Sequence, residues 1–265
     1  MSAWYRAVAR DLPWRQTSDP YRILVSEVML QQTQVARVVP RYRRFLDRFP
    51  TVESLASAPR STVLAEWSGL GYNTRAVRLH EAARVVARDG WPRSAAELRE
   101  LPGIGPYTAA AVASFAFGEK VAAVDTNVRR VLSRWAGGDL SGRDLAAHAA
   151  AALDHDDPAT WNQAMMELGA TVCRPRDPNC AECPASSWCT DPSVRPAVAR
   201  QPAFQGSLRQ VRGAVVRTLT LRSSATVESL VSTTGHDLAL IDEAVSGLER
   251  DGVVVRDRSS VRLPN

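Results

Sequence analysis

The 265-residue chain contains a single lysine, Lys120, among its 33 basic residues, so arginine supplies almost all of its positive charge. Any reaction that requires a side-chain amine therefore has one candidate. No apolar run approaches the ~18 to 20 residues that a membrane-spanning helix needs. The N-terminal segment MSAWYRAVARDLPWR also lacks the apolar core and cleavage site of a signal peptide. We therefore expect a cytoplasmic protein that does not associate with membranes.

Signs of β-structure are also few. Apolar residues recur at three- and four-residue intervals from about 21 to 190, and no alternating strand pattern appears there. Proline and glycine separate these segments, which predicts many short helices. After a proline-rich linker, the segment 207–265 has the pattern of three helices and a β-hairpin, which indicates a winged-helix-like module. Such a module could bind DNA, cap the structure or contact another protein.

Cysteine is scarce, and all four cysteines lie in one short segment. Cys173, Cys180, Cys183 and Cys189 form a C-x6-C-x2-C-x5-C run. Because disulfides are uncommon in the cytoplasm, clustered thiols indicate a metal or an iron–sulfur cluster. Zinc sites usually combine two short C-x2-C-like units, and only one such unit occurs in this run. A four-cysteine iron–sulfur cluster fits the spacing better.

The segment LPGIGPYTAAAV at 101–112 places two glycines in a short turn before an alanine-rich helix. Gly103 and Gly105 lack a Cβ, which lets the backbone turn tightly and approach a ligand closely. The start of the following helix offers N–H groups and the positive end of a dipole, which favour an anion such as phosphate. The net charge of +5 also favours an anionic partner. An ordinary turn between two helices is the alternative.

This turn, the segment VDTNVRRV after it and the cysteine run occur in an order that resembles the helix-hairpin-helix DNA glycosylases of the endonuclease III superfamily. The segments LPWR, DPYRILVSEVMLQQTQV, WSGLGY and WNQAMMELGATVC are similar to the MutY-type adenine glycosylases. The resemblance covers residues 4 to about 190. It implies a mostly α-helical, two-lobed fold with an iron–sulfur cluster loop. It does not bear on the last 60 residues, for which the winged-helix-like module is expected from the pattern of 207–265 alone.

The resemblance also implies a division of the chain and a partner. The expected parts are an iron–sulfur cluster lobe at 1–20 and 121–192, a six-helix lobe at 21–120 with the helix-hairpin-helix at about 98–118, a linker at 193–206, and the winged-helix-like module at 207–265. The expected partner is double-stranded DNA with a mismatch or an oxidised base, bound by a monomer associated with the nucleoid. The expected cofactor is a 4Fe-4S cluster on the four cysteines.

A pair of carboxylates would carry the chemistry. Glu27, within the apolar segment LVSEVML, matches the general acid that protonates the departing base, and desolvation favours its neutral form. Asp125 matches the carboxylate that stabilises the sugar cation, as in glycosidases. Asn127 follows it, whereas Thr126 stands where the family usually has glycine. A buried structural glutamate and a helix N-cap are the simpler interpretations of the two acids.

Tyr107 occupies the position at which bifunctional relatives carry a lysine that attacks the sugar as a Schiff-base nucleophile. A phenol cannot form that imine, and Lys120 lies outside the matched position. We therefore expect a monofunctional glycosylase without efficient β-lyase activity. Its reaction would be excision of adenine mispaired with 8-oxoguanine or guanine in base excision repair.

The resemblance assigns two further groups of residues. The first group is expected to contact DNA, and two of its members, Gln31 and Tyr72, would act as wedges that fill the gap left by the flipped nucleotide. The whole group is Gln31, Gln32, Thr33, Tyr72, Leu101, Gly103 and Gly105. Those expected to line the adenine pocket are Trp14, Arg10, Gln163 and Met166. An aromatic wedge replaces base stacking worth ~1 to 3 kcal/mol, and glutamine offers a donor and an acceptor to a base edge. The spacing at Arg10 is one residue shorter than in the family.

Besides Thr126, the C-terminus departs from the family pattern, and two alternative functions are open. MutY enzymes typically end in a domain resembling nucleotide-pyrophosphate hydrolases that recognises 8-oxoguanine, and residues 205–265 are too few for it. A strong preference for 8-oxoguanine over guanine is therefore in doubt. One alternative is a thymine or uracil mismatch glycosylase of the same superfamily, but the segments SEVMLQQTQ and NQAMMELG favour adenine. The other is a non-catalytic DNA-damage-binding protein or regulator, against which both carboxylates argue.

Overall fold

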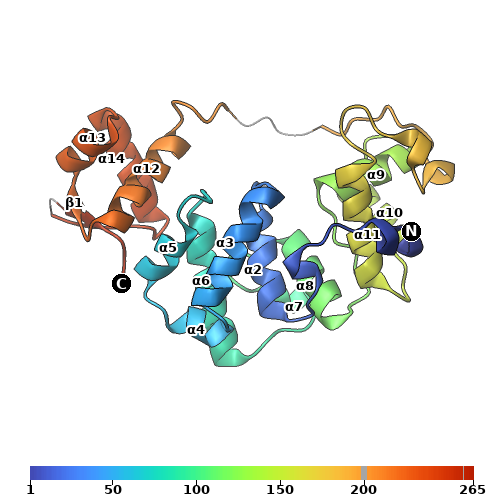
Figure 1. Ribbon diagram of the computed structural model, residues 1–265, viewed down its shortest axis with the longest axis horizontal. Coiled ribbons are helices and arrows are strands. Elements are labelled where there is room, and N and C mark those ends of the chain that lie inside the picture. Colours follow the sequence, from blue (N-terminus) through green and yellow to red (C-terminus); the bar gives the residue numbers. More distant parts are fainter. Residues whose placement is uncertain (198–201, 259) are drawn as a thin grey trace. The chain divides into compact units, whose positions relative to one another are not determined.

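The computed structural model describes residues 1–197, 202–258 and 260–265. This part of the chain is mostly helical with one small sheet, as the sequence predicted (Figure 1). Its contacts separate it into two units. None of the described helices is long and apolar enough to span a bilayer.

The first unit contains Met1–Leu24, Pro92–Glu100 and the chain from Ile104 into the linker. Helix α11 is central to it, because it packs against α1, α8 and α9. Val131 and Leu168 belong to the apolar core between these helices. The elements of this unit are α1 (Ser2–Val8), η1 (Pro13–Arg15), the start of α2 (Pro20–Leu30), α7 (Ala95–Leu98), α8 (Pro106–Phe117), α9 (Thr126–Ala136), α10 (Gly142–Ala152), α11 (Pro158–Thr171), η2 (Cys180–Glu182) and η3 (Ser186–Trp188).

Helix α8 follows the glycine turn. It begins with Pro106, whose missing N–H has no partner to lose at the first helical position. It ends at Gly118, which adopts the left-handed conformation with a φ of 68°. Residues 108–114 are all buried, since small alanine side chains allow close packing. Contacts with α7 and α11 group α8 with the first unit, although the sequence-based division places it in the six-helix lobe.

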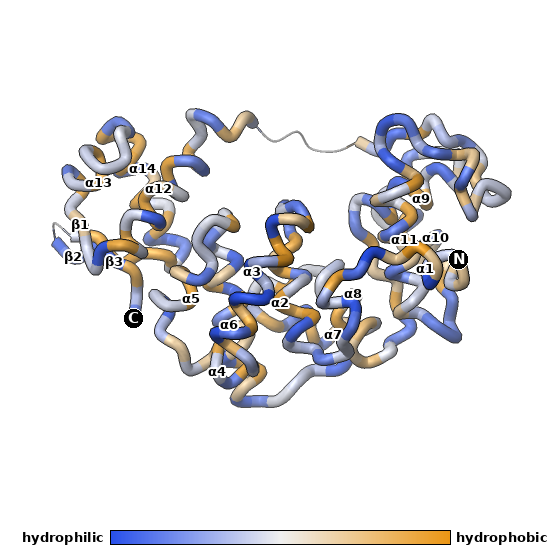
Figure 2. The backbone as a smooth tube through the Cα atoms, viewed as in Figure 1, coloured by the Kyte–Doolittle hydropathy of each residue, from blue (hydrophilic) through white to orange (hydrophobic). Residues whose placement is uncertain are grey.

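The second unit contains Val25–Trp91, Leu101–Gly103 and the C-terminal module. Helix α4 packs along α6, and α5 packs on α3 and α6. The rings of Phe45 and Trp67, both fully buried, meet edge to face with centroids 6.0 Å apart. Hydrophobic and hydrophilic residues alternate along the helices of both units, as periodic apolar faces require (Figure 2). The helices before the C-terminal module are the rest of α2, α3 (Val35–Arg48), α4 (Val52–Ser57), α5 (Arg60–Trp67) and α6 (Thr74–Asp89).

The C-terminal module contains the three helices and the hairpin that the sequence predicted. A short strand, β1, precedes the second helix and was not predicted, because two residues are too few to show an alternating pattern. It pairs antiparallel with β3, with Ala225 opposite Val261, and the strand order is β1-β3-β2. The module consists of α12 (Leu208–Leu221), β1 (Ala225–Thr226), α13 (Val227–Thr234), α14 (Leu238–Arg250), β2 (Val255–Asp257) and β3 (Ser260–Arg262).

Candidate active site and DNA-binding loops

Asp125 is the N-cap of α9. Its Oδ1 accepts a hydrogen bond from the backbone N–H of Val128 at 2.7 Å, and its Oδ2 accepts one from Nδ2 of Asn127 at 2.9 Å. Burial raises the pKa of Asp125, whereas these two bonds stabilise the charged form and act in the opposite direction. The Asp125 side chain therefore caps the helix, and its two hydrogen bonds favour the charged form against the effect of burial.

Asn127 is itself held in place by neighbours in the first unit. Arg130 donates through Nη2 to Oδ1 of Asn127 at 2.9 Å and to the carbonyl oxygen of Gly169 at 2.7 Å. A Cβ on Gly169 would lie 2.6 Å from the Cβ of Asn127, so glycine is needed where α11 approaches α9. Thr126 is exposed and does not have a positive φ. The backbone there does not require the glycine that the family usually has.

Helix α11 presents Gln163, Met166 and Glu167 on one face, because residues three and four apart lie above one another on a helix. The hydroxyl of Tyr5 donates to Oε1 of Gln163 at 2.5 Å. The hydroxyl of Tyr107 lies 3.8 Å from Sδ of Met166. Gln163 and Met166, two of the predicted pocket residues, therefore share one face of α11, and Tyr107 of α8 lies against Met166 on that face. The acceptor of Gln163 is engaged, and its amide NH2 can still donate to a base.

Glu167, which has no exposed surface, binds two arginines from the N-terminal segment. Arg10 donates through Nε and Nη2 to its two oxygens at 2.7 and 2.9 Å, and Arg15 donates through Nη2 at 2.6 Å. Burial by itself would raise the pKa of Glu167, but the bonds from the arginines outweigh it and lower this pKa. Trp14, between these arginines in the chain, lies on η1 and is buried. Arg10 thus directs its guanidinium to a carboxylate of the protein.

The sequence analysis missed three residues of this cluster, namely Tyr5, Arg15 and Glu167. A signal for two of them was present, because Arg15 ends the LPWR segment and Glu167 lies in NQAMMELG. A glutamate in an otherwise apolar helix needs a cation when it is buried. Tyr5 offered no such signal, since its partner is 158 positions away in the chain.

Glu27 lies in the part of α2 that belongs to the second unit, and its exposed fraction is 5%. Val25, Val28 and Met29 around it are also buried, as the apolar pattern predicted. Such surroundings favour the neutral form of a carboxyl group. Glu27 and Asp125 belong to different units.

Arg75, on α6, connects the two loops that were predicted to act as wedges. Its guanidinium donates to backbone carbonyl oxygens at the end of α2 and in the WSGLGY loop, namely those of Val28 (2.8 Å), Met29 (3.0 Å), Gln31 (2.6 Å), Leu70 (3.2 Å) and Gly71 (3.0 Å). Nη2 also lies 3.3 Å from Oγ1 of Thr33. Burial lowers the pKa of Arg75 to about 10, so it stays charged at neutral pH. Sequence analysis did not identify this residue.

Two residues of these loops have unusual backbone conformations. Gln32 and Tyr72 have φ angles of 55° and 48°, in the left-handed region that side chains other than glycine adopt at a cost. Both side chains are exposed, Tyr72 by 37%. The Arg75 guanidinium lies 5.6 Å from the centre of the Tyr72 ring. The protein therefore holds two predicted DNA-contacting side chains on its surface in strained loops.

The two glycines of the helix-hairpin-helix turn have different requirements. Gly103 has a φ of 75°, and a Cβ there would lie 2.5 Å from the Cβ of Arg78. Gly105 has a φ of −84° and forms the N-cap of α8, and nothing lies within 4 Å of the position that a Cβ would take. Leu101 is buried. The turn itself depends on Gly103, whereas Gly105 leaves open space at the start of a helix. Lys120 is exposed in the loop that follows α8.

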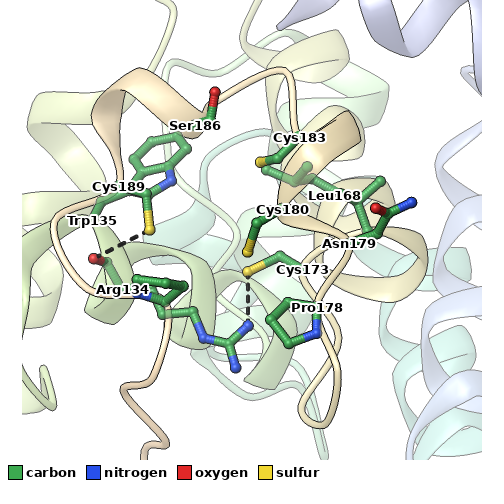
Figure 3. A pocket seen from close by; sticks show the side chains of 12 residues that line it. Arg134, Trp135, Leu168, Cys173, Pro178, Asn179, Cys180, Cys183, Ser186 and Cys189 are labelled. Atoms are coloured by element: carbon green, nitrogen blue, oxygen red, sulfur yellow. Dashed lines mark hydrogen bonds between the residues drawn. The ribbon is translucent and has the colours of Figure 1, made fainter.

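The four cysteines line one pocket of about 120 Å³ together with Arg134 and Trp135 (Figure 3). Nη1 of Arg134 donates to Sγ of Cys173 at 3.1 Å. Burial raises the pKa of Cys183 and of Cys189, and the neighbouring thiols raise both further. Within the part of the chain that the structure describes, no group of three or more His, Cys, Asp or Glu side chains is placed to hold a metal ion. The thiols thus surround a space without converging on one point.

Comparison with known proteins agrees with this fold. Residues 25–151 match the model of the HhH-GPD superfamily base excision DNA repair proteins. An adenine DNA glycosylase of Mycolicibacterium smegmatis is 42% identical over 264 residues, which cover 95% of this chain and 90% of the relative. The adenine DNA glycosylase of Homo sapiens is 45% identical over 205 residues, which cover 71% of this chain and 38% of the relative. The chain belongs to the HhH-GPD superfamily of base excision DNA repair proteins.

A solved structure adds a second kind of relative. A thermostable thymine-DNA glycosylase superposes with a TM-score of 0.67 at 35% sequence identity, covering 71% of this chain and 91% of that chain.

The Mycolicibacterium smegmatis relative has a counterpart for most of the C-terminal module. Its alignment leaves only one twentieth of this chain uncovered, which is too short to contain the module. Most of the module therefore has a counterpart in a protein described as an adenine DNA glycosylase.

Proposed function

We propose that the protein is a monomeric DNA glycosylase that hydrolyses the N-glycosyl bond of adenine mispaired with 8-oxoguanine or guanine. The observation that carries the proposal is the environment of Asp125, a carboxylate that burial makes harder to ionise and that two hydrogen bonds keep oriented at the start of α9. The relatives described as adenine DNA glycosylases support adenine as the base. This reaction is a step of base excision repair.

In the proposed reaction, Glu27 donates a proton to a ring nitrogen of the adenine. The electron pair of the N-glycosyl bond leaves with the base, and a positive charge develops on the sugar. Asp125 stabilises that charge as a carboxylate, and a water molecule then adds to the sugar carbon and gives a proton to the Glu27 carboxylate, which restores the acid. This is the division between acid and carboxylate that glycosidases use.

The nucleotide must first leave the base stack, which costs a few kcal/mol. Gln31 and Tyr72, with the neighbouring Gln32 and Thr33, would fill the gap that it leaves. The open N-terminus of α8 at Gly105 would bind a backbone phosphate. On α11, Gln163 and Met166 would contact the base, with Trp14 beside them. Arg10 would act through Glu167, to which it is bound.

We also assign a 4Fe-4S cluster to Cys173, Cys180, Cys183 and Cys189. The pocket that all four thiols line and the single C-x2-C unit in their spacing support a polynuclear cluster over a zinc ion. When bound, such a cluster stabilises the loop that holds it. Cys180→Ser should remove the visible absorption of the cluster and lower thermal stability, whereas Ser187→Ala, an exposed position in the same loop, should leave both unchanged.

The deciding experiment measures base release from four duplexes, with adenine opposite 8-oxoguanine, adenine opposite guanine, thymine opposite guanine and uracil opposite guanine. The unaltered protein should release adenine, and Glu27→Gln should slow release about 100-fold or more, the lower end of what a general acid contributes. Its binding to the adenine duplex should remain. Release of pyrimidine alone would support the alternative of a thymine or uracil glycosylase. The observation that favours this alternative is the similarity to the thymine-DNA glycosylase structure. No release at all would support a damage-binding protein.

A further inference from the structure

The C-terminal module contacts the segment that carries the proposed wedge tyrosine. Nη1 of Arg209, on α12, donates to the hydroxyl oxygen of Tyr72 at 2.8 Å, and the guanidinium carbon lies 6.0 Å from the centre of the ring. Arg209 also donates through Nη2 to the carbonyl oxygen of Pro202 at 2.6 Å. Tyr72 is therefore held from outside its own loop by a residue 137 positions later in the chain.

A second contact lies two residues further along the same segment. Thr74, the first residue of α6, donates through its hydroxyl to Oδ2 of Asp251 at 3.2 Å. Asp251 follows α14, and Arg212 on α12 donates to the same carboxylate oxygen. Arg209 and Arg212 lie three residues apart and therefore on one face of α12. This face binds the Tyr72–Thr74 segment at both ends, once directly and once through Asp251.

The helix surface that a winged-helix protein would place on DNA carries mainly acidic residues in this module, which disfavours DNA binding there. In a helix-turn-helix arrangement the second helix, here α14, enters the major groove. Its exposed charged residues are Asp242, Glu243, Glu249 and Arg250, so the helix surface is predominantly acidic. Acidic side chains repel the phosphates that supply most non-specific affinity for DNA. DNA binding through α14 is therefore disfavoured, whereas α12 contacts the Tyr72–Thr74 segment.

We propose that the C-terminal module braces the wedge loop and that Arg209 is the positioning residue for Tyr72. The inference rests on the proposed function, in which Tyr72 enters the DNA stack. Tyr72 has a φ of 48°, a conformation that persists only when the surroundings determine it. Arg75 fixes the backbone of the loop by donating hydrogen bonds to the carbonyl oxygens of Leu70 and Gly71. Arg209 fixes the tip of the side chain, so the ring is held ready to insert.

The test is a double-mutant cycle in the full-length protein, with Arg209→Gln, Tyr72→Phe and both changes together. Tyr72→Phe removes the hydroxyl that accepts the bond and keeps the ring that stacks. One readout is the single-turnover rate on the duplex with adenine opposite 8-oxoguanine. The other is the fluorescence of 2-aminopurine beside the mismatch, which rises on unstacking and is measured in the Glu27→Gln background. Arg217→Gln, an exposed arginine on the same helix, is the control for the loss of one positive charge.

We expect Arg209→Gln to lower the rate and the fluorescence rise about 3- to 10-fold, from the loss of a charged hydrogen bond and a cation–π contact at a partly exposed site. Tyr72→Phe should have a similar but smaller effect, and the double variant should be no worse than Arg209→Gln alone. Arg217→Gln should change both readouts less than about 2-fold. The melting temperature of each of the four variants should lie within about 4 °C of that of the unaltered protein, because one partly exposed contact contributes about 1 kcal/mol.

Three results would overturn the brace. They are additive effects of Arg209→Gln and Tyr72→Phe, an equal loss in Arg217→Gln, and a faster reaction in Arg209→Gln, which would mean that the contact restrains the wedge. Tyr72→Ala separates this inference from the proposed function. If Tyr72→Ala changes neither readout, the wedge role itself fails and the brace fails with it. If Tyr72→Ala lowers both readouts while Arg209→Gln lowers neither, only the brace fails.

Discussion

At the scale of single residues, Asp125 is a carboxyl group on which burial and hydrogen bonding act in opposite directions. Burial raises the pKa of this carboxyl, and the hydrogen bonds from Asn127 and Val128 limit the rise. A carboxylate that stabilises a cation must be ionised, so the excision rate should fall as the pH drops through the pKa of Asp125. In the proposed mechanism, the residues around Asp125 set the acid limit of the reaction.

Asn127→Ala removes one of those hydrogen bonds and should therefore raise the pKa of Asp125 further. The acid limb of the pH–rate profile should move to higher pH, and the loss of rate should be larger at acid pH than at neutral pH. Single-turnover rates on the adenine duplex across the pH range measure this shift. Thr126→Gly, a change at an exposed neighbour, should leave the limb where it is. A limb that does not move in Asn127→Ala would mean that another group sets it.

Glu167→Gln should lower the free energy of unfolding by about 2 to 4 kcal/mol, somewhat below the usual range for a buried ion pair because Arg10 is partly exposed. The lowered pKa of Glu167 means that its charge stabilises the fold above the ordinary value of 4.5. That contribution is lost as the pH falls through the folded-state pKa, so the difference between the two proteins should shrink below about pH 4.5. Denaturant unfolding at several pH values measures it.

The control for Glu167→Gln is a neighbouring ion pair. Arg6 pairs with Asp157 at 3.0 Å, and 66% of the Arg6 side chain is exposed. Arg6→Gln should therefore cost only about 0 to 1 kcal/mol. A cost as large as that of Glu167→Gln would show that the N-terminal segment depends on charge in general rather than on the buried carboxylate.

At the scale of elements, Arg75 is the group that ties the end of α2 to the WSGLGY loop. Arg75→Lys keeps the charge but replaces a planar fork by three donors, which cannot reach the same set of carbonyl oxygens. We expect a loss of about 2 to 3 kcal/mol in unfolding free energy, from buried acceptors left without a donor. Hydrogen exchange should quicken at 28–33 and 68–73. Arg78→Lys, on the exposed side of α6, should change the unfolding free energy by no more than about 0.5 kcal/mol and should leave hydrogen exchange at 28–33 and 68–73 as it is.

The elements also show what the sequence could and could not predict. Helical periodicity and the Pro106 and Gly118 boundaries predict α8, and the apolar run predicts that Glu27 is buried. The pattern of 207–265 predicts three helices and a hairpin, but a two-residue strand leaves no periodic signal. Contacts between distant segments were not predictable either. Arg75 and Arg209 look like ordinary surface arginines in a chain with 32 arginines, and only the folded chain brings them to Tyr72.

At the scale of the whole molecule, the near absence of lysine limits the chemistry that the protein can perform on the sugar. Lys120 is exposed beyond the end of α8. The family resemblance implies that Tyr107 stands where bifunctional relatives carry the Schiff-base amine. Borohydride should therefore trap no covalent complex with DNA during adenine excision. Tyr107→Lys supplies the missing amine and should make such a complex detectable by gel electrophoresis. A Lys120-dependent complex with the unaltered protein would refute the monofunctional assignment.

The same scarcity makes the molecule simple to tag. Besides the amine at the start of the chain, an acylating dye can react with one position only, at the end of α8 in the loop that leads to Asp125. A reporter attached there would follow the arrival of DNA near Asp125, the proposed catalytic carboxylate, without the engineering of new cysteines beside the four that line the pocket.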